Sequence, residues 1–321
     1  MYLGIEIGGT KLQLGVGPAD GTLSGLWRGN VDPAAGAEGI RRQILESVPE
    51  LLQSSHIDRG IVKAAGIGFG GPVDDATQRI IKSHQVAGWD DFPIATWLSD
   101  ALHIPAVLGN DADVAGLAEA LFGAGQGLSP IFYITIGSGI GGGLIVDGEI
   151  QRGVGRGAAE IGHLRVLDRR DPDAPSMVPL EEVASGWGIG RHARRLLGES
   201  AWPDSLVLSM IGGDPSLVTA YHVGVAARHG DAFGLSRLNE ALDSLSEAIC
   251  AVIVLLCPRR IVIGGGVSLV GEKHFFEPLR KKVAERVFQP FAGLTDIVPA
   301  ALGEAVVIHG ALALAKMRTN V

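Results

Sequence analysis

The chain alternates short apolar runs with longer stretches in which apolar residues return every three or four positions. The short runs predict β-strands at residues 2–7, 12–16, 62–69, 106–108, 131–136, 144–146 and 260–263. The longer stretches predict helices at residues 36–52, 92–102, 239–256 and 305–316, with another that begins after Asp111. A chain that alternates strands and helices in this way is typical of an α/β protein.

Two segments repeat one local pattern. Residues 2–16 and 131–146 each place a glycine-rich turn between two strands, and each turn carries a hydroxyl side chain, Thr10 in the first and Ser138 in the second. The repetition suggests a duplicated fold with one such hairpin in each of two domains. The length of 321 residues agrees with two domains, because one hydrophobic core rarely grows beyond about 250–300 residues.

Composition narrows the class of protein. The 47 glycines fall in short runs and not at every third position, which excludes a collagen. A net charge of −8 without a basic stripe argues against a nucleic-acid partner. Two cysteines, Cys250 and Cys257, are too few for a disulfide framework or a four-thiolate metal site. No export signal or membrane helix is predicted, so we expect a cytoplasmic protein.

The glycine turns are candidate phosphate sites, because glycines leave backbone N–H groups open to an anion. The candidate residues are Gly8, Gly9, Thr10 and Lys11 in the first turn, Gly137, Ser138 and Gly139 in the second, and Gly265 and Gly266 after the strand at 260–263. Neither hairpin fits the P-loop or the dinucleotide fingerprint, since both of those open into a helix. The alternative is that each turn only connects two strands.

Other candidates are polar residues at the ends of elements. Asn110 and Asp111 lie where a strand ends and a helix begins. Asp111 could accept a proton from a substrate hydroxyl or could simply cap the helix. Glu160 and His163 have the spacing of one helical turn and could share a ligand, although a lone histidine is more often structural. Glu181 alone is a carboxylate at a helix start.

Taken together, these segments resemble the ROK family of sugar kinases, within the actin-like ATPase superfamily. The segments that carry the resemblance, in chain order, are residues 7–11, 68–74, 109–112, 135–143, 160–163 and 258–267. The resemblance implies a two-domain α/β fold of the ribonuclease H-like type with an interdomain cleft. One lobe would comprise residues 1–114 plus 303–321, and the other residues 115–302.

The resemblance also implies an activity, the ATP-dependent phosphorylation of a hexose hydroxyl. Asp111 would be the general base toward the 6-hydroxyl of a glucose-like sugar, and the glycine turns would hold ATP. The implied sugar-binding residues are Gly71, Asn110, Glu160, His163 and Glu181. Glu6 would help to hold Mg²⁺ through water. A homodimer is a further implication, since family members often form one.

The chain departs from the family pattern at three places. Glu6 stands where the family usually has aspartate, which bears on the metal. Residues 164–179 contain no cysteine, although the family carries a cysteine-rich zinc motif there, so we expect no structural zinc. We expect packing by Leu164, Val166, Val178 and Leu180 to replace it. His84 lies in a segment where the family usually has asparagine, which bears on the choice of sugar.

Several functions remain open from the sequence. Glucose is the leading substrate, but mannose, fructose, an N-acetylated amino sugar and a cyclitol are alternatives, as is polyphosphate in place of ATP. A catalytically idle sugar-binding protein is a second class, suggested by Glu6 and the missing zinc motif. A sugar-responsive repressor is a third class, and it is disfavoured because the first phosphate motif begins by residue 7 and leaves no room for a DNA-binding segment ahead of it.

Overall fold

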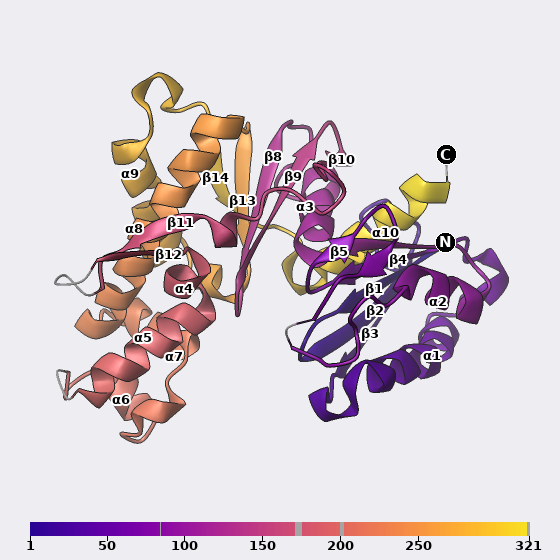
Figure 1. Cartoon of the computed structure of the whole chain (residues 1–321), viewed down its shortest axis with the longest axis horizontal. Coiled ribbons are helices and arrows are strands. Elements are labelled where there is room, and N and C mark those ends of the chain that lie inside the picture. The colour runs from indigo at the N-terminus through magenta and orange to yellow at the C-terminus, as the bar shows by residue number, and fades with distance from the viewer. Residues whose placement is uncertain (84, 171–174, 200–201, 320–321) are drawn as a thin grey trace. The chain divides into compact units, whose positions relative to one another are not determined.

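The computed structural model describes residues 1–83, 85–170, 175–199 and 202–319 (Figure 1). His84 therefore lies outside the described residues. The chain divides into two compact units. Unit 1 comprises Met1–Tyr133, Gly143–Ala159 and the chain from Ala301 onward, and unit 2 comprises Ile134–Gly142 and Glu160–Ala300. The lobe boundary expected between residues 114 and 115 stays a prediction.

Five strands of unit 1 form a sheet in the order β3-β2-β1-β4-β7. The strands are β1 (Tyr2–Ile7), β2 (Lys11–Gly17), β3 (Gly25–Asn30), β4 (Ala65–Phe69) and β7 (Ala106–Asn110). The first three are antiparallel neighbours, whereas β4 runs parallel to β1, and β7 parallel to β4. A two-stranded hairpin, β5 (Val73–Asp74) and β6 (Arg79–Ile80), follows β4. The N-terminal strand–turn–strand prediction is confirmed.

Helices cover both faces of this sheet (Figure 1). The helices of unit 1 are α1 (Gly36–Ser54), α2 (Ile94–Leu102), α3 (Asp111–Phe122) and α10 (Val306–Thr319). One face of β1 presents Leu3 and Ile5, which share a buried core with Ile40 of α1 and Leu98 of α2. The other face packs against α10, which also contacts α3. The alternation of large side chains along β1 therefore decides which helices lie on which face.

The face of the sheet under α10 is lined by glycines. Gly4, Gly15 and Gly66 are direct neighbours across three strands. A Cβ on Gly66 would overlap the backbone of Ala311, and one on Gly15 would overlap Ile308. The glycines thus allow α10 to lie directly against the strands, closer than any larger residue would permit.

The second sheet repeats the strand order of the first. Its order is β10-β9-β8-β13-β14. The strands are β8 (Ile131–Ile136), β9 (Ile140–Val146), β10 (Glu149–Ile150), β13 (Arg260–Gly264) and β14 (Asp296–Pro299). Numbered along the chain, both sheets have the order third, second, first, fourth and fifth strand. The duplication suggested by the two glycine hairpins is confirmed at this level.

The remaining elements belong to unit 2. The helices are α4 (Glu181–Ala184), α5 (Gly186–Gly198), α6 (Leu206–Met210), α7 (Ala220–Arg228), α8 (Ala232–Leu256) and α9 (Glu277–Arg286). A separate hairpin consists of β11 (Arg165–Asp168) and β12 (Ser176–Pro179). The predicted helix at 239–256 is the second part of α8, which begins earlier because Asp231 caps it by accepting the Gly234 N–H at 2.8 Å. In the part of the chain that is described, no helix is both long and apolar enough to cross a bilayer.

Candidate functional site

The first glycine turn joins β1 to β2 and exposes polar groups. The Gly8 N–H donates to the Lys11 carbonyl at 3.0 Å and closes the turn. A Cβ on Gly9 would overlap the side chain of Gln85, so the turn has no room for a larger residue there. Thr10 and Lys11 are both exposed. The turn therefore presents a hydroxyl, an ammonium and bare backbone on one surface, which suits an anion.

Glu6 lies buried near the end of β1, beside this turn. Its Oε2 accepts from Gln13 Nε2 at 2.7 Å, and its Oε1 lies 3.3 Å from Lys11 Nζ. Burial raises the pKa of the Glu6 carboxyl, whereas Lys11 and Gln13 act in the opposite direction. The carboxylate is therefore held in one orientation by two partners from the adjoining strand.

The parallel strands of unit 1 end together beside Asp111. Ile7, Phe69 and Asn110 are aligned in register at the carboxyl ends of β1, β4 and β7. Asp111 follows at once, partly exposed, and its Oδ2 lies 3.3 Å from the position that a Cβ on Gly70 would take. A side chain at position 70 would therefore crowd this carboxylate, which lies at the sheet edge where α/β proteins place their ligands.

Asn110, and not Asp111, is the residue that caps the N-terminus of α3. The helix cap is Asn110, whose Oδ1 accepts from the Ala112 N–H at 2.9 Å. Its Nδ2 donates to the Gly71 carbonyl at 3.0 Å, which ties the segment 68–74 to the start of α3. The capping interpretation of Asp111 is therefore wrong. Asp111 is the first helical residue, with Oδ1 accepting from the Ala112 N–H at 2.8 Å.

The second glycine turn, in unit 2, is fixed from two sides. The Gly186 N–H donates to the Gly137 carbonyl at 2.8 Å, and the Trp187 N–H donates to the Ser138 carbonyl at 3.1 Å. Gly265 adopts a φ of +87°, and a Cβ there would meet the Ile136 backbone at 2.5 Å. The turn after β13 therefore lies against the strand that leads into Gly137, so the two predicted phosphate turns of unit 2 are neighbours.

Glu160, His163 and Glu181 come together in unit 2. The His163 N–H donates to the Glu160 carbonyl at 3.1 Å in a short 3₁₀ turn. Loss of surrounding water raises the pKa of Glu160 although the residue is exposed; His163 lowers it, and the like charge of Glu181 raises it further. Glu181 in turn reaches the second glycine turn, with Oε2 3.1 Å from the Cβ position of Gly139.

The predicted residues thus form two sets, one in each unit. Unit 1 holds the first glycine turn with Glu6, Gly71, Asn110 and Asp111. Unit 2 holds the turns at 137–139 and 265–266 together with Glu160, His163 and Glu181. Among the described residues, no group of three or more His, Cys, Asp or Glu side chains has the arrangement of a metal site.

Three residues beside these sets have structural roles that the sequence analysis did not assign. Gln13 orients Glu6, Gly70 leaves the space beside Asp111 Oδ2 without a side chain, and Arg170 donates to the Glu182 carbonyl at 3.0 Å. Only Gln13 had a signal, a polar side chain at an inward position of an otherwise apolar strand. The other two depend on contacts between distant segments.

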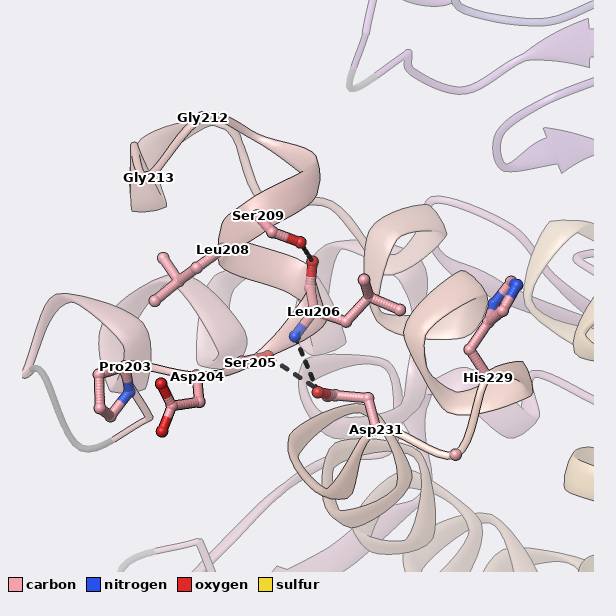
Figure 2. A pocket seen from close by; sticks show the side chains of 11 residues that line it. Pro203, Asp204, Ser205, Leu206, Leu208, Ser209, Gly212, Gly213, His229 and Asp231 are labelled. Atoms are coloured by element: carbon pink, nitrogen blue, oxygen red, sulfur yellow. Dashed lines mark hydrogen bonds between the residues drawn. The ribbon is translucent and has the colours of Figure 1, made fainter.

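A separate open hollow of about 600 Å³ lies in unit 2 around α6, away from these residues (Figure 2). One of its carboxylates, Asp231, accepts from the Leu206 N–H at 2.8 Å and from Ser205 Oγ at 3.3 Å. The same carboxylate caps α8. The Asp231 carboxylate therefore joins the start of α6 to the start of α8. None of the predicted site residues lines the hollow.

Comparison with known proteins gives a consistent result. The model of the ROK family matches residues 2–318. A glucokinase from Thermotoga maritima is 32% identical over 98% of this chain and 97% of its own, and an N-acetylgalactosamine kinase from Shewanella sp. is 28% identical over 85% and 83%. A ROK glucokinase from Streptomyces griseus, solved with glucose and AMPPNP, is 29% identical with a TM-score of 0.81 over 98% and 99% of the two chains. This chain belongs to the ROK family and has its actin-like ATPase fold.

Proposed function

We propose that this protein, an ATP-dependent sugar kinase, transfers the terminal phosphoryl group of ATP to the 6-hydroxyl of a glucose-like hexose, with Asp111 as the general base. The observation that carries the proposal is the position of Asp111. It follows directly on aligned strand ends, and a Cβ on Gly70 would lie 3.3 Å both from Asp111 Oδ2 and from the carbonyl of Ile7, the last residue before the first glycine turn. The similarity to glucokinases over nearly the whole chain supports the choice of a glucose-like acceptor.

Asp111 has the surroundings that a general base for a hydroxyl requires. It is the first residue of α3, where the positive end of the helix dipole favours an ionised carboxylate. The Ala112 N–H fixes Oδ1, and Oδ2 faces Gly70. A carboxylate held this way accepts the proton as the sugar oxygen attacks phosphorus. The rest of phosphoryl transfer needs mainly positioning and charge stabilisation.

Sugar recognition falls to Glu160, His163 and Glu181, with Asn110 and Gly71 from unit 1. A hexose offers several hydroxyls that both donate and accept, so it needs carboxylate, imidazole and amide partners. The coupling of Glu160 to both His163 and Glu181 supports a shared ligand for these three side chains.

The glycine turns would hold ATP through their backbone N–H groups. These residues are Gly8, Gly9, Thr10, Lys11, Gly137, Ser138, Gly139, Gly265 and Gly266. Mg²⁺ prefers oxygen ligands and keeps several waters. Glu6 fits that requirement as a carboxylate that acts through water, since Lys11 and Gln13 already contact its oxygens. When bound, the ion would neutralise charge on the phosphates.

A structural zinc does not fit the residues present. Such sites use cysteine and histidine, and residues 164–180 contain neither. Burial supports the packing expected in its place: Val166 and Leu180 are buried, whereas Leu164 and Val178 are half-buried. A homodimer, a cytoplasmic location and the lack of a nucleic-acid partner stay predictions.

The test is an ADP-release assay over a panel of sugars, with ATP and polyphosphate as donors. The panel contains glucose, mannose, fructose, N-acetylated amino sugars and a cyclitol. We expect turnover with ATP and glucose. Turnover with an amino sugar alone would show that the acceptor is an amino sugar and not glucose, in line with the similarity to an N-acetylgalactosamine kinase. Sugar binding by calorimetry without turnover on any acceptor would overturn the kinase proposal and leave a sugar-binding protein.

The Asp111→Asn variant tests the role of the base. We expect kcat to fall by about 10²–10⁴ while sugar affinity changes little. The matched control is Asp100→Asn, the same change at an exposed position of α2, which should leave kcat unaltered. Equal losses of affinity and turnover in Asp111→Asn would show that the carboxylate serves binding or folding.

A further inference from the structure

The segment between His163 and Glu181 is folded back on itself. Its two strands, β11 and β12, pair so that Val166 lies opposite Val178. At the base of this hairpin, the Leu180 N–H donates to the Leu164 carbonyl at 2.8 Å, and the Leu180 side chain is fully buried. The residue after His163 is therefore bonded to the residue before Glu181. The hairpin thus brings together His163 and Glu181, which are 18 positions apart in the sequence.

Arg170 extends from the same hairpin to the residue after Glu181. Its Nε and Nη2 donate to the two carboxylate oxygens of Asp168 at 2.8 and 2.6 Å, and its Nη1 donates to the Glu182 carbonyl at 3.0 Å. The side chains of Arg170 and Asp168 are only 15% and 16% exposed. A bidentate pair between a guanidinium and a carboxylate is directional as well as strong. The pair with Asp168 therefore fixes the direction in which Arg170 Nη1 donates to the Glu182 carbonyl.

The hydrogen bond from Arg170 to the Glu182 carbonyl matters because α4 is short. The helix is one turn, Glu181–Ala184, and a single turn has little stability of its own. Its first residue, Glu181, extends toward Gly139, and the chain after it continues into Gly186, which is bonded to Gly137. The Glu182 carbonyl also lies 3.4 Å from Arg191 Nη2, but the Arg191 side chain is 58% exposed. The buried anchor of α4 on this side is therefore Arg170.

We propose that Arg170, held by Asp168, is a positioning residue that sets the orientation of Glu181 for sugar binding. The inference rests on the proposed function, in which Glu181 contacts the sugar. It also accounts for the departure from the family pattern. In the segment where the resemblance implies a zinc motif, this chain uses a hydrophobic hairpin and an arginine–aspartate pair, and neither needs a metal.

The test compares Arg170→Met with Arg169→Met. Arg169 is the adjacent arginine, but it is 57% exposed and pairs with Glu247 on α8. We expect Arg170→Met to raise the sugar KM by roughly tenfold to a hundredfold, with the ATP KM and the kcat at saturating sugar little changed. Arg169→Met should leave all three at the wild-type values. Arg170→Lys keeps the charge but loses the fork geometry, so its sugar KM should fall between the two.

A double variant separates positioning from general stability. If Arg170 acts through Glu181, Arg170→Met should add little to the sugar KM of Glu181→Gln, because coupled residues are not additive. Independent, multiplying effects would overturn the proposal, as would a rise in ATP KM equal to that in sugar KM. If Arg170→Met does not fold, Arg170→Lys carries the same two comparisons. A wild-type protein without turnover on any sugar would refute the proposed function, whereas an active enzyme indifferent to Arg170→Met would refute only this inference.

Discussion

Glu160 shares its surroundings with a second carboxylate, and this gives the site a defined response to acid. The pKa of Glu160 is raised above 4.5 by loss of surrounding water and by the charge of Glu181, against the opposing effect of His163. A carboxylate with a raised pKa takes up its proton at a higher pH than usual. The ionised form accepts sugar hydroxyls without offering a proton of its own, so binding should be strongest above that raised pKa.

We predict that, as the pH is lowered, the sugar KM begins to rise at a higher pH than it would if Glu160 had the pKa of an ordinary glutamate. In Glu181→Gln the like charge is gone, so the pKa of Glu160 falls and the rise in KM moves to lower pH. Sugar KM measured across the acid range for both proteins checks this, with ATP KM over the same range as the control. A rise at the same pH in both proteins would show that Glu181 does not influence Glu160.

Individual residues were predictable from the sequence where type and local position were enough. Asp111 was found because a carboxylate at a strand-to-helix junction is recognisable in one sequence. That Asn110 and not Asp111 caps α3 was not, because adjacent residues compete for the same N–H groups and only the backbone geometry decides between them. Arg170 gave no signal, since its partner carbonyl lies twelve positions away in another element.

At the scale of elements, the contact between α10 and the first sheet depends on glycines. Gly66→Ala should lower the free energy of unfolding by about 1–3 kcal/mol, since its Cβ would overlap the carbonyl of Ala311 and a backbone cannot move aside cheaply. Gly198→Ala is the matched control, because a Cβ at the end of α5 meets nothing within 4 Å. Urea unfolding of both variants measures the difference. Equal stabilities would mean that α10 can shift away from the strands.

The elements themselves were predicted unevenly, for a physical reason. Strands 2–7 and 131–136 were predicted to the residue, because a strand that is buried along its length is an almost continuous apolar run. The run 137–143 was assigned wholly to a turn, yet β9 begins at Ile140, because backbone pairing does not require side chains and glycines hide a strand. Helices α4, α5, α6, α7 and α9 were missed. Of these, α4 and α6 have only four and five residues, which is too short to show a helical period.

At the scale of the whole molecule, the duplication of the fold could be predicted from the sequence, but the hydrogen bonds between distant segments could not. Two hairpins of similar pattern predicted two similar halves, and both sheets have the same strand order. The bonds that complete each half join distant segments, such as Gly186 to Gly137 and Leu180 to Leu164. Local pattern cannot supply such pairs, so the second glycine turn was predicted as a candidate without the helix that holds it.

The last prediction concerns how the molecule remains folded without a metal. Structural zinc contributes about 10–16 kcal/mol of binding free energy in small domains, so its removal from a protein that uses it lowers the melting temperature strongly. Here Leu180 is buried and the Arg170–Asp168 pair is well shielded, so the segment after His163 is held by its own side chains. We expect purified protein to contain far less than one zinc per chain by mass spectrometry. A strong chelator should leave Tm and the sugar affinity of the free enzyme unchanged, with a zinc-finger domain as the positive control. Stoichiometric zinc whose removal lowers Tm would show instead that ligands elsewhere in the chain, and not this hairpin, stabilise the fold.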